Sequence, residues 1–103
     1  MNVTELPFAI DHGKIADFCR ARGIRKLSVF GSVLRDDFDP GRSDVDALIE
    51  FLPGTRTGFR FFGYADELSG ILGHKVDLNT PAMLSRHFRD EALREALTLY
   101  EQT

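Results

Sequence analysis

The sequence lacks the features of secreted and membrane proteins. It holds one cysteine, Cys19, so no internal disulfide can form, and its place in an apparent helix indicates a core or boundary residue. No apolar run approaches the roughly 18 residues that a membrane helix requires. A secretory leader, with its basic start before an apolar stretch, is also missing from the first residues. These absences predict a cytoplasmic protein with no membrane contact.

The sequence also lacks an excess of positive charge. Its formal net charge is -3, whereas duplex-coating proteins depend on many cationic contacts to phosphate, so we expect no strong nucleic-acid binding. The simplest interpretation of the basic side chains that do cluster is a solvated surface. They are Arg20, Arg22, Arg25, Lys26, Arg56 and Arg60. With 103 residues and an ordinary globular composition, the chain predicts a single domain spanning residues 1–103.

Periodicity along the chain predicts alternating helices and strands, and therefore an α/β or α+β fold. Helices are expected over residues 11–21 and from residue 59 to near Gly73, and residues 81–100 are expected to hold a short turn and then a helix. A brief helical turn is expected from Val33 to about Asp37. Strands are expected over residues 27–30, 44–52 and 75–79. We expect the phenylalanines near residue 60 to lie in the core.

Two carboxylates stand at the start of the second expected strand. Asp44 and Asp46 alternate with Val45 and Ala47, so in an extended chain both acids point to one face. Like charges at this spacing oppose each other's ionisation unless a positive charge lies between them. A divalent cation is the simplest explanation.

A third acid and a turn complete the pattern. Asp77 alternates with Val76 and Leu78, so it joins the acid face if the strands share a sheet. Gly31-Ser32 ends the first strand, where a glycine lets the backbone approach a ligand and a following helical turn directs N–H groups at it. Ser43 is interpreted as a turn residue that orients Asp44. Glu50 is expected to point to the same face as Asp44 and Asp46, but it lies farther along the strand, so we leave it out of the proposed metal ligands.

No spacing among the histidines suggests a metal site, and surface or boundary positions are the simpler interpretation. They are His12, His74 and His87.

The combination of Phe30-Gly31-Ser32, Arg35, Ser43-Asp44-x-Asp46 and a later lone Asp77 resembles the nucleotidyltransferase superfamily that includes DNA polymerase beta. Because the chain ends soon after the third acid, it is similar to the minimal nucleotidyltransferases, in particular MntA-type antitoxins encoded beside HEPN-domain toxins. The resemblance covers roughly residues 24 to 101. It extends to the following C-terminal positions: Val76-Asp77-Leu78, Pro81, Leu84, Arg89, Leu93-Arg94-Glu95-Ala96 and Tyr100.

The resemblance implies a palm-type fold, in which a small mixed sheet has helices on one face and the active site on the other. It also implies an enzyme that transfers a nucleotidyl group from a nucleoside triphosphate. The expected cofactor is Mg²⁺, as two ions held by Asp44, Asp46 and Asp77, with Asp77 able to accept the hydroxyl proton. The triphosphate is expected to contact Gly31, Ser32 and Arg35. A surface ion pair is the alternative for Arg35. Ser43 is included among the nucleotide-site residues.

For the antitoxins of this family, the resemblance implies that AMP passes from ATP to a tyrosine hydroxyl of the partner HEPN-type ribonuclease toxin. The Arg56 to Phe62 loop and the C-terminal helix are surfaces suited to that partner, although core aromatics and an ordinary packed helix are the simpler interpretation. Two alternatives stay open: an antitoxin that neutralises by binding alone, and nucleotidyl transfer to a small molecule or an RNA end. One departure is Asp36-Asp37, which follows Arg35 where many relatives have glycine.

Overall fold

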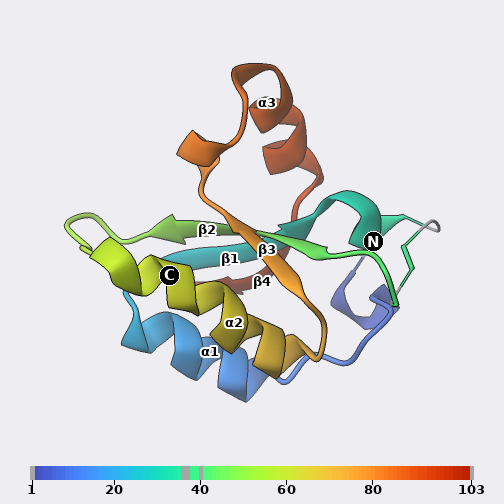
Figure 1. Cartoon of the computed structure of the whole chain (residues 1–103), viewed down its shortest axis with the longest axis horizontal. Coiled ribbons are helices and arrows are strands. Elements are labelled where there is room, and N and C mark those ends of the chain that lie inside the picture. Colours follow the sequence, from blue (N-terminus) through green and yellow to red (C-terminus); the bar gives the residue numbers. More distant parts are fainter. Residues whose placement is uncertain (1, 36–37, 40, 103) are drawn as a thin grey trace.

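The computed structural model describes residues 2–35, 38–39 and 41–102, whose helices pack against a four-stranded sheet (Figure 1). The order across the sheet is β3-β2-β1-β4. β2 pairs with β3 in parallel, whereas β1 is antiparallel to both β2 and β4, so the sheet is mixed. The strands are β1 (Ile24–Phe30), β2 (Val45–Phe51), β3 (Val76–Asn79) and β4 (Leu97–Glu101). The helices are α1 (His12–Ala21), α2 (Phe61–Leu72) and α3 (Arg86–Glu95).

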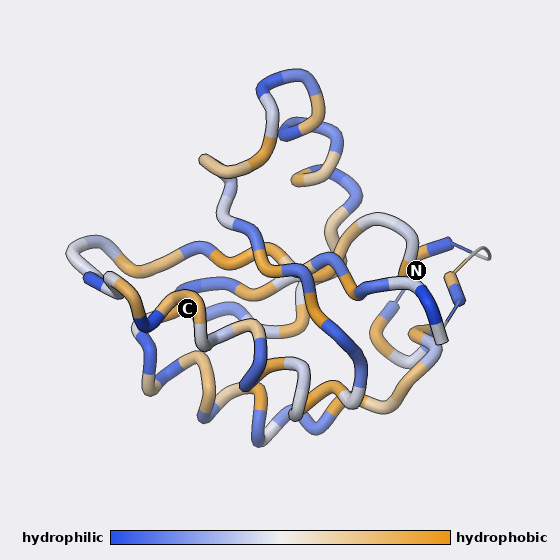
Figure 2. The backbone as a smooth tube through the Cα atoms, viewed as in Figure 1, coloured by the Kyte–Doolittle hydropathy of each residue, from blue (hydrophilic) through white to orange (hydrophobic). Residues whose placement is uncertain are grey.

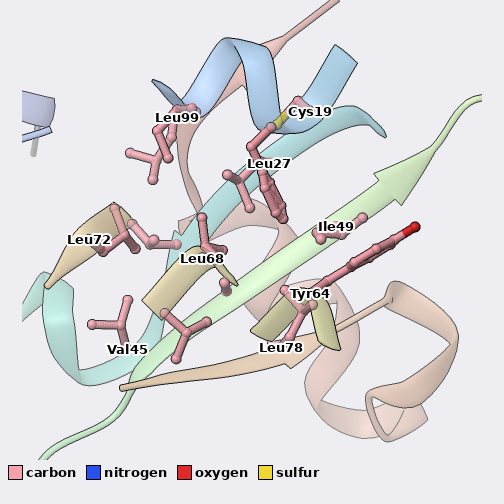
Figure 3. Packing of buried hydrophobic residues seen from close by; sticks show 14 of the residues in the cluster. Cys19, Leu27, Val45, Ile49, Tyr64, Leu68, Leu72, Leu78 and Leu99 are labelled. Atoms are coloured by element: carbon pink, nitrogen blue, oxygen red, sulfur yellow. The ribbon is translucent and has the colours of Figure 1, made fainter. Parts of the chain in front are cut away.

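The main core lies between one face of the sheet and the pair α1 and α2 (Figure 3). In α1, Ile15, Phe18 and Cys19 are buried, which is the one-sided spacing of an amphipathic helix. Asp11 caps this helix by accepting the Lys14 N–H at 3.1 Å. Burial raises the pKa of the Cys19 thiol to about 12, although Arg22 and Arg20 lower it, so the predicted core role is confirmed.

The opposite face of the sheet has a smaller apolar cluster. Phe30 and Leu48 pack there against Leu84 and Ala92, which come from the segment before α3 and from α3 itself. Phe88 of α3 adds to this cluster, with its ring centroid 6.0 Å from that of Phe30. Most of the helix is polar, and Figure 2 shows its hydrophilic turns projecting from the sheet. The predicted mixed sheet with helices on one face is confirmed for α1 and α2, while α3 adds a partial cover on the acid face.

The predicted C-terminal helix is wrong beyond Glu95. Leu97–Glu101 forms β4, where Leu97 and Tyr100 pair with Val29 and Leu27 of β1. The helical spacing of apolar residues was compatible with a helix, but pairing to a strand about 70 positions earlier satisfies the same backbone groups and buries Leu99.

The prediction that the phenylalanines near residue 60 lie in the core is wrong for two of them. Phe59 and Phe62 are 91% and 75% exposed, whereas Phe61 packs on Phe51 with ring centroids 6.3 Å apart. The periodicity of α2 turns Tyr64, Leu68 and Leu72 inward and leaves Phe62 on the outer side.

Within the described residues, none of the helices is long and apolar enough to cross a membrane.

Candidate active site

Asp46 and Asp77 lie side by side on neighbouring parallel strands. They are register partners in the β2–β3 pair. Their strand neighbours Val45, Ala47 and Val76 are buried in the main core, so the two acids point to the opposite face. Asp44 directly precedes β2 and is half-buried. The structure therefore brings together the three carboxylates that the sequence pattern predicts.

The Gly31 turn touches the same acids. β1 pairs with β2 so that Phe30 stands opposite Asp46, and the chain then enters a 3-10 turn, η2 (Gly31–Leu34). Gly31 has a φ of +76°, and a Cβ added there would lie 2.5 Å from Asp46 Oδ2. A side chain at this position would both strain the backbone and occupy the space of the carboxylate. The turn and the acid face therefore form one site.

The grouping of acids changes the ionisation of the central one. Burial raises the pKa of the Asp46 carboxyl, Asp77 and Asp44 raise it further, and Arg35 lowers it. Carboxylates that repel one another in this way are relieved by a cation bound between them. The donor set of three acids thus fits a hard, oxygen-liganded ion such as Mg²⁺.

The three acids do not form a complete cage. In residues 2–35, 38–39 and 41–102, no three acidic, imidazole or thiol side chains converge tightly enough to hold a metal ion by themselves. Mg²⁺ in nucleotide enzymes is commonly bound by one or two carboxylates together with water and substrate phosphates. An open arrangement of acids beside a phosphate-sized turn fits that mode of binding.

Lys75 is a site residue that the sequence pattern does not reveal. Its Nζ lies 3.9 Å from Asp44 Oδ2, and its side chain is 81% exposed. The Val45 N–H donates to the Lys75 carbonyl at 2.8 Å, which fixes the two chain segments together. A lysine just before a strand is common, and only the parallel pairing of β3 with β2 places this one beside Asp44.

The serines occupy the two turns of the site. Ser32 lies inside η2 rather than at its cap, because the cap position is Phe30. The Ser32 carbonyl accepts the Arg35 N–H at 2.9 Å, which closes the turn. Ser43 Oγ accepts the Asp39 N–H at 3.0 Å, and the Ser43 N–H donates to the Asp39 carbonyl at 2.7 Å. Ser43 therefore acts as the predicted turn residue before Asp44.

A cleft of about 340 Å³ opens beside the turn and is lined by Gly31, Leu34, Arg35 and Glu95. Arg35 is exposed but close enough to Asp46 to influence its pKa. Glu95 comes from the last turn of α3, and no local pattern in the sequence signals its approach to the turn. Asp36-Asp37, which follow Arg35, lie outside the described residues.

A family model described as the nucleotidyltransferase domain matches residues 13–99. The chain belongs to the nucleotidyltransferase domain family. It is also 32% identical over 74 residues to a protein of Methanocaldococcus jannaschii named as a putative protein adenylyltransferase. That alignment covers 72% of this chain and 74% of the relative.

Several solved structures share the fold, including the following two. One is described as a putative minimal nucleotidyltransferase, with 32% identity, a TM-score of 0.68, and coverage of 84% of this chain and 86% of the other. The second is the MNT antitoxin in complex with a tri-AMPylated Shewanella oneidensis HEPN toxin. It is 19% identical with a TM-score of 0.61, covers 88% of this chain and 70% of the other, and shows similarity of fold alone. The predicted family, the palm-type fold and the enzyme class, a nucleotidyltransferase, are confirmed.

Proposed function

We propose that this nucleotidyltransferase transfers AMP from ATP to a tyrosine hydroxyl of a partner HEPN-type toxin and thereby inactivates it. The observation that supports this most directly is the position of Asp46, which lies against the Gly31 turn on one side and beside Asp77 on the other. A triphosphate bound at the turn would have its phosphates next to the acids. Because the reaction consumes ATP and controls a ribonuclease, we place it in the cytoplasm.

The acids are proposed to hold two Mg²⁺ ions. Asp44 and Asp46 would hold them, and Asp77 would complete the site of the second ion. When bound, the ions neutralise the phosphate charge and lower the proton affinity of the attacking hydroxyl. The raised pKa of Asp46, caused by burial and by Asp77 and Asp44, supports a cation at this position.

The turn is proposed to bind the triphosphate. Backbone N–H groups after Gly31 and the Ser32 hydroxyl are donors at the start of η2, and the absence of a side chain at Gly31 allows close approach. Arg35 adds positive charge at the edge of the cleft. We propose that Ser43 contributes by fixing the loop that presents Asp44.

The chemical step is a displacement at the α-phosphorus. The tyrosine oxygen forms a bond to phosphorus while the bond to the bridging oxygen breaks, and pyrophosphate leaves. Asp77, which is exposed on the edge strand, accepts the hydroxyl proton. The products are AMP-tyrosine and pyrophosphate.

The nature of the acceptor is supported by two relatives. The 32% identical archaeal protein is named as an adenylyltransferase of proteins, and the structurally similar MNT antitoxin is bound to an AMPylated HEPN toxin. This chain shares the fold of the antitoxin and belongs to the nucleotidyltransferase domain family. A HEPN-domain protein encoded by a neighbouring gene is therefore the acceptor that we propose.

The test is to incubate the chain with that HEPN-domain protein, Mg²⁺ and ATP and to weigh the partner by intact-mass spectrometry. We expect the partner to gain one or more AMP groups on tyrosine, and we expect Asp44→Asn and Asp46→Asn to abolish the gain. An unchanged partner mass in a tight and inactive complex, with both variants still neutralising, would contradict the proposal and support inhibition by binding alone.

A further inference from the structure

The end of the molecule opposite the acids has two phenylalanines in solvent. Phe59 and Phe62 are 91% and 75% exposed, and their ring centroids are 6.5 Å apart. They lie where the chain enters α2, at the left end of the view in Figure 1, whereas η2 lies toward the right. Paired exposed aromatic rings on a small domain indicate an interaction surface.

Two arginines flank these rings without a carboxylate partner. Arg56 and Arg60 are exposed, and within the described part of the chain neither lies within ion-pair distance of an acid. The other arginines of this end are paired, since Arg22 contacts Glu67 at 2.6 Å and Arg25 contacts Glu50 at 2.9 Å. At this end of the described chain, the unpaired arginines are therefore the two that are close to the phenylalanines in sequence.

A groove lies beside Arg60, which follows Phe59 in the chain. It has a volume of about 400 Å³ and is lined by Arg60, Tyr64 and Glu67 at the α2 side and by Ala21 and Arg22 at the α1 end. Arg22 is held in this groove, because its guanidinium lies 4.3 Å from the Phe18 ring centroid and donates to Glu67, which neutralises its charge. Phe59, Phe62, Arg56, Arg60 and this groove are called the aromatic-basic surface below.

We infer that the aromatic-basic surface docks the acceptor protein through an acidic segment with aliphatic side chains. Aromatic residues and arginine are the residue types that dominate binding energy at protein interfaces, and two unpaired cations complement an acidic partner. This inference rests on the proposed function, because it names where the acceptor binds. The chain's net charge of -3 favours a protein occupant over an RNA.

The position of the surface separates docking from chemistry. Five residue steps along β2 lie between Asp46 and Phe51, which packs on Phe61 at the start of α2. Those steps span roughly 17 Å in an extended strand, which is within the roughly 30 Å diameter of a small partner domain. Because the acids lie on the face of the sheet opposite α1 and α2, one partner that holds the aromatic-basic surface must extend around the end of the sheet to present a tyrosine at the acids. Changes at the surface leave the nucleotide site intact.

The experiment compares the chain with a Phe59→Ala/Phe62→Ala variant and an Arg56→Glu/Arg60→Glu variant. Partner binding is measured by calorimetry in an Asp46→Asn background, so that unmodified complexes persist, and AMP transfer is measured at varied partner concentration. Mg²⁺-ATP binding and the thermal unfolding midpoint report whether the site and the fold are intact. Met83→Ala is the matched control, since Met83 is an exposed apolar side chain outside the surface.

We expect the partner's dissociation constant and its KM to rise at least about tenfold in both surface variants, with Mg²⁺-ATP binding, the unfolding midpoint and the Met83→Ala variant unchanged. The effect of the charge reversal should shrink as salt is added. Unchanged partner affinity in the phenylalanine variant would overturn the inference. Loss of self-association or of RNA binding in the surface variants, with partner binding unchanged, would also overturn it.

Failure of the proposed function has a different signature. A wild-type chain that binds the HEPN-domain protein tightly but adds no AMP contradicts the proposed reaction, while loss of that binding in the surface variants still supports the docking site. A chain that modifies the partner equally well with and without Phe59 and Phe62 supports the reaction and overturns the docking site.

Discussion

Gly31 and Asp46 occupy complementary space, because a Cβ on Gly31 would lie 2.5 Å from Asp46 Oδ2. Gly31 directly follows β1, and Asp46 lies on the antiparallel neighbour β2, with Phe30 and Asp46 as register partners. The end of β1 and the acid face therefore leave no room between them for a side chain at the turn that is proposed to bind phosphate. The first prediction follows from this pair.

Gly31→Ala is expected to weaken Mg²⁺-ATP binding strongly and to destabilise the fold by about 1–3 kcal/mol, because the φ of +76° is strained for alanine and the methyl group displaces the Asp46 carboxylate. Gly54→Ala is the matched control: its φ is +83°, but a Cβ there meets nothing within 4 Å. Urea unfolding should show a lower free energy of unfolding in both variants, and calorimetry should show weaker nucleotide binding only in Gly31→Ala. Equal nucleotide binding in both would contradict the proposed phosphate turn.

Asp46→Asn is expected to raise the unfolding midpoint at pH 7 when no divalent cation is present. Burial and the charges of Asp77 and Asp44 raise the pKa of Asp46 above its ordinary value of 3.8, so ionising this carboxyl costs more in the folded chain than in the unfolded one. That cost appears as the pH rises through the folded pKa and is absent below about 3.8, where the group is protonated in both states.

The measurement is thermal unfolding of wild type and Asp46→Asn between pH 3.5 and pH 8, with and without Mg²⁺. The stability gained by the variant should increase with pH, and Mg²⁺ should stabilise the wild type more than the variant. A difference between the two proteins that is constant with pH would show that the raised pKa of Asp46 does not affect folding.

Lys75→Met is expected to tighten divalent-cation binding. The ammonium group lies 3.9 Å from Asp44 Oδ2, so it competes with a cation for the same carboxylate, and its exposed side chain makes the competition weak. We expect the Mn²⁺ dissociation constant, measured by calorimetry, to fall by a few-fold. Lys14→Met, an exposed lysine on α1, is the control and should leave Mn²⁺ affinity unchanged.

Weaker Mn²⁺ binding in Lys75→Met would contradict this competition. The KM for ATP gives a second readout. If Lys75 also contacts the phosphates once the ion is bound, Lys75→Met would show a higher KM for ATP together with tighter Mn²⁺ binding.

Asp77→Asn is expected to lower the rate of AMP transfer by about 10²–10⁴-fold, because the amide cannot accept the hydroxyl proton. Glu50→Gln is the matched control on the same face of the sheet. Glu50 accepts from Arg25 at 2.9 Å, so its role is an ion pair at the far end of β2, and its loss should leave the rate nearly unchanged. Single-turnover kinetics at saturating ATP measure the step; a comparable loss in Glu50→Gln would show that the proposed metal set is incomplete.

The sequence predicts most of what positions the site. Alternation in β2 and β3 places Asp44, Asp46 and Asp77 on one face, and the structure agrees because alternation depends only on local backbone geometry. The turn at Gly31 is predicted for the same local reason. The parallel pairing that sets Asp46 opposite Asp77 is consistent with the pattern, although the pattern alone leaves the register open.

What the sequence does not predict depends on distant partners. The segment from Leu97 is a strand because β1 offers it a hydrogen-bonding edge, and local spacing cannot report that edge. Phe59 and Phe62 are exposed because α2 buries a different side, a choice that depends on where the sheet lies. Lys75 and Glu95 reach the site through strand pairing and the end of α3, which are likewise long-range arrangements.

The sheet order also indicates that the acids differ in mobility. β1 and β2 are the two inner strands, so Gly31 and Asp46 follow or occupy strands that are hydrogen-bonded on both sides. Asp77 lies on β3, a four-residue strand at the edge with a neighbour on one side only. Amide hydrogen exchange should therefore be slowest in β1 and β2 and faster in β3. The residue proposed to take the proton is thus on the strand that can shift most easily as a tyrosine arrives and as the modified tyrosine leaves.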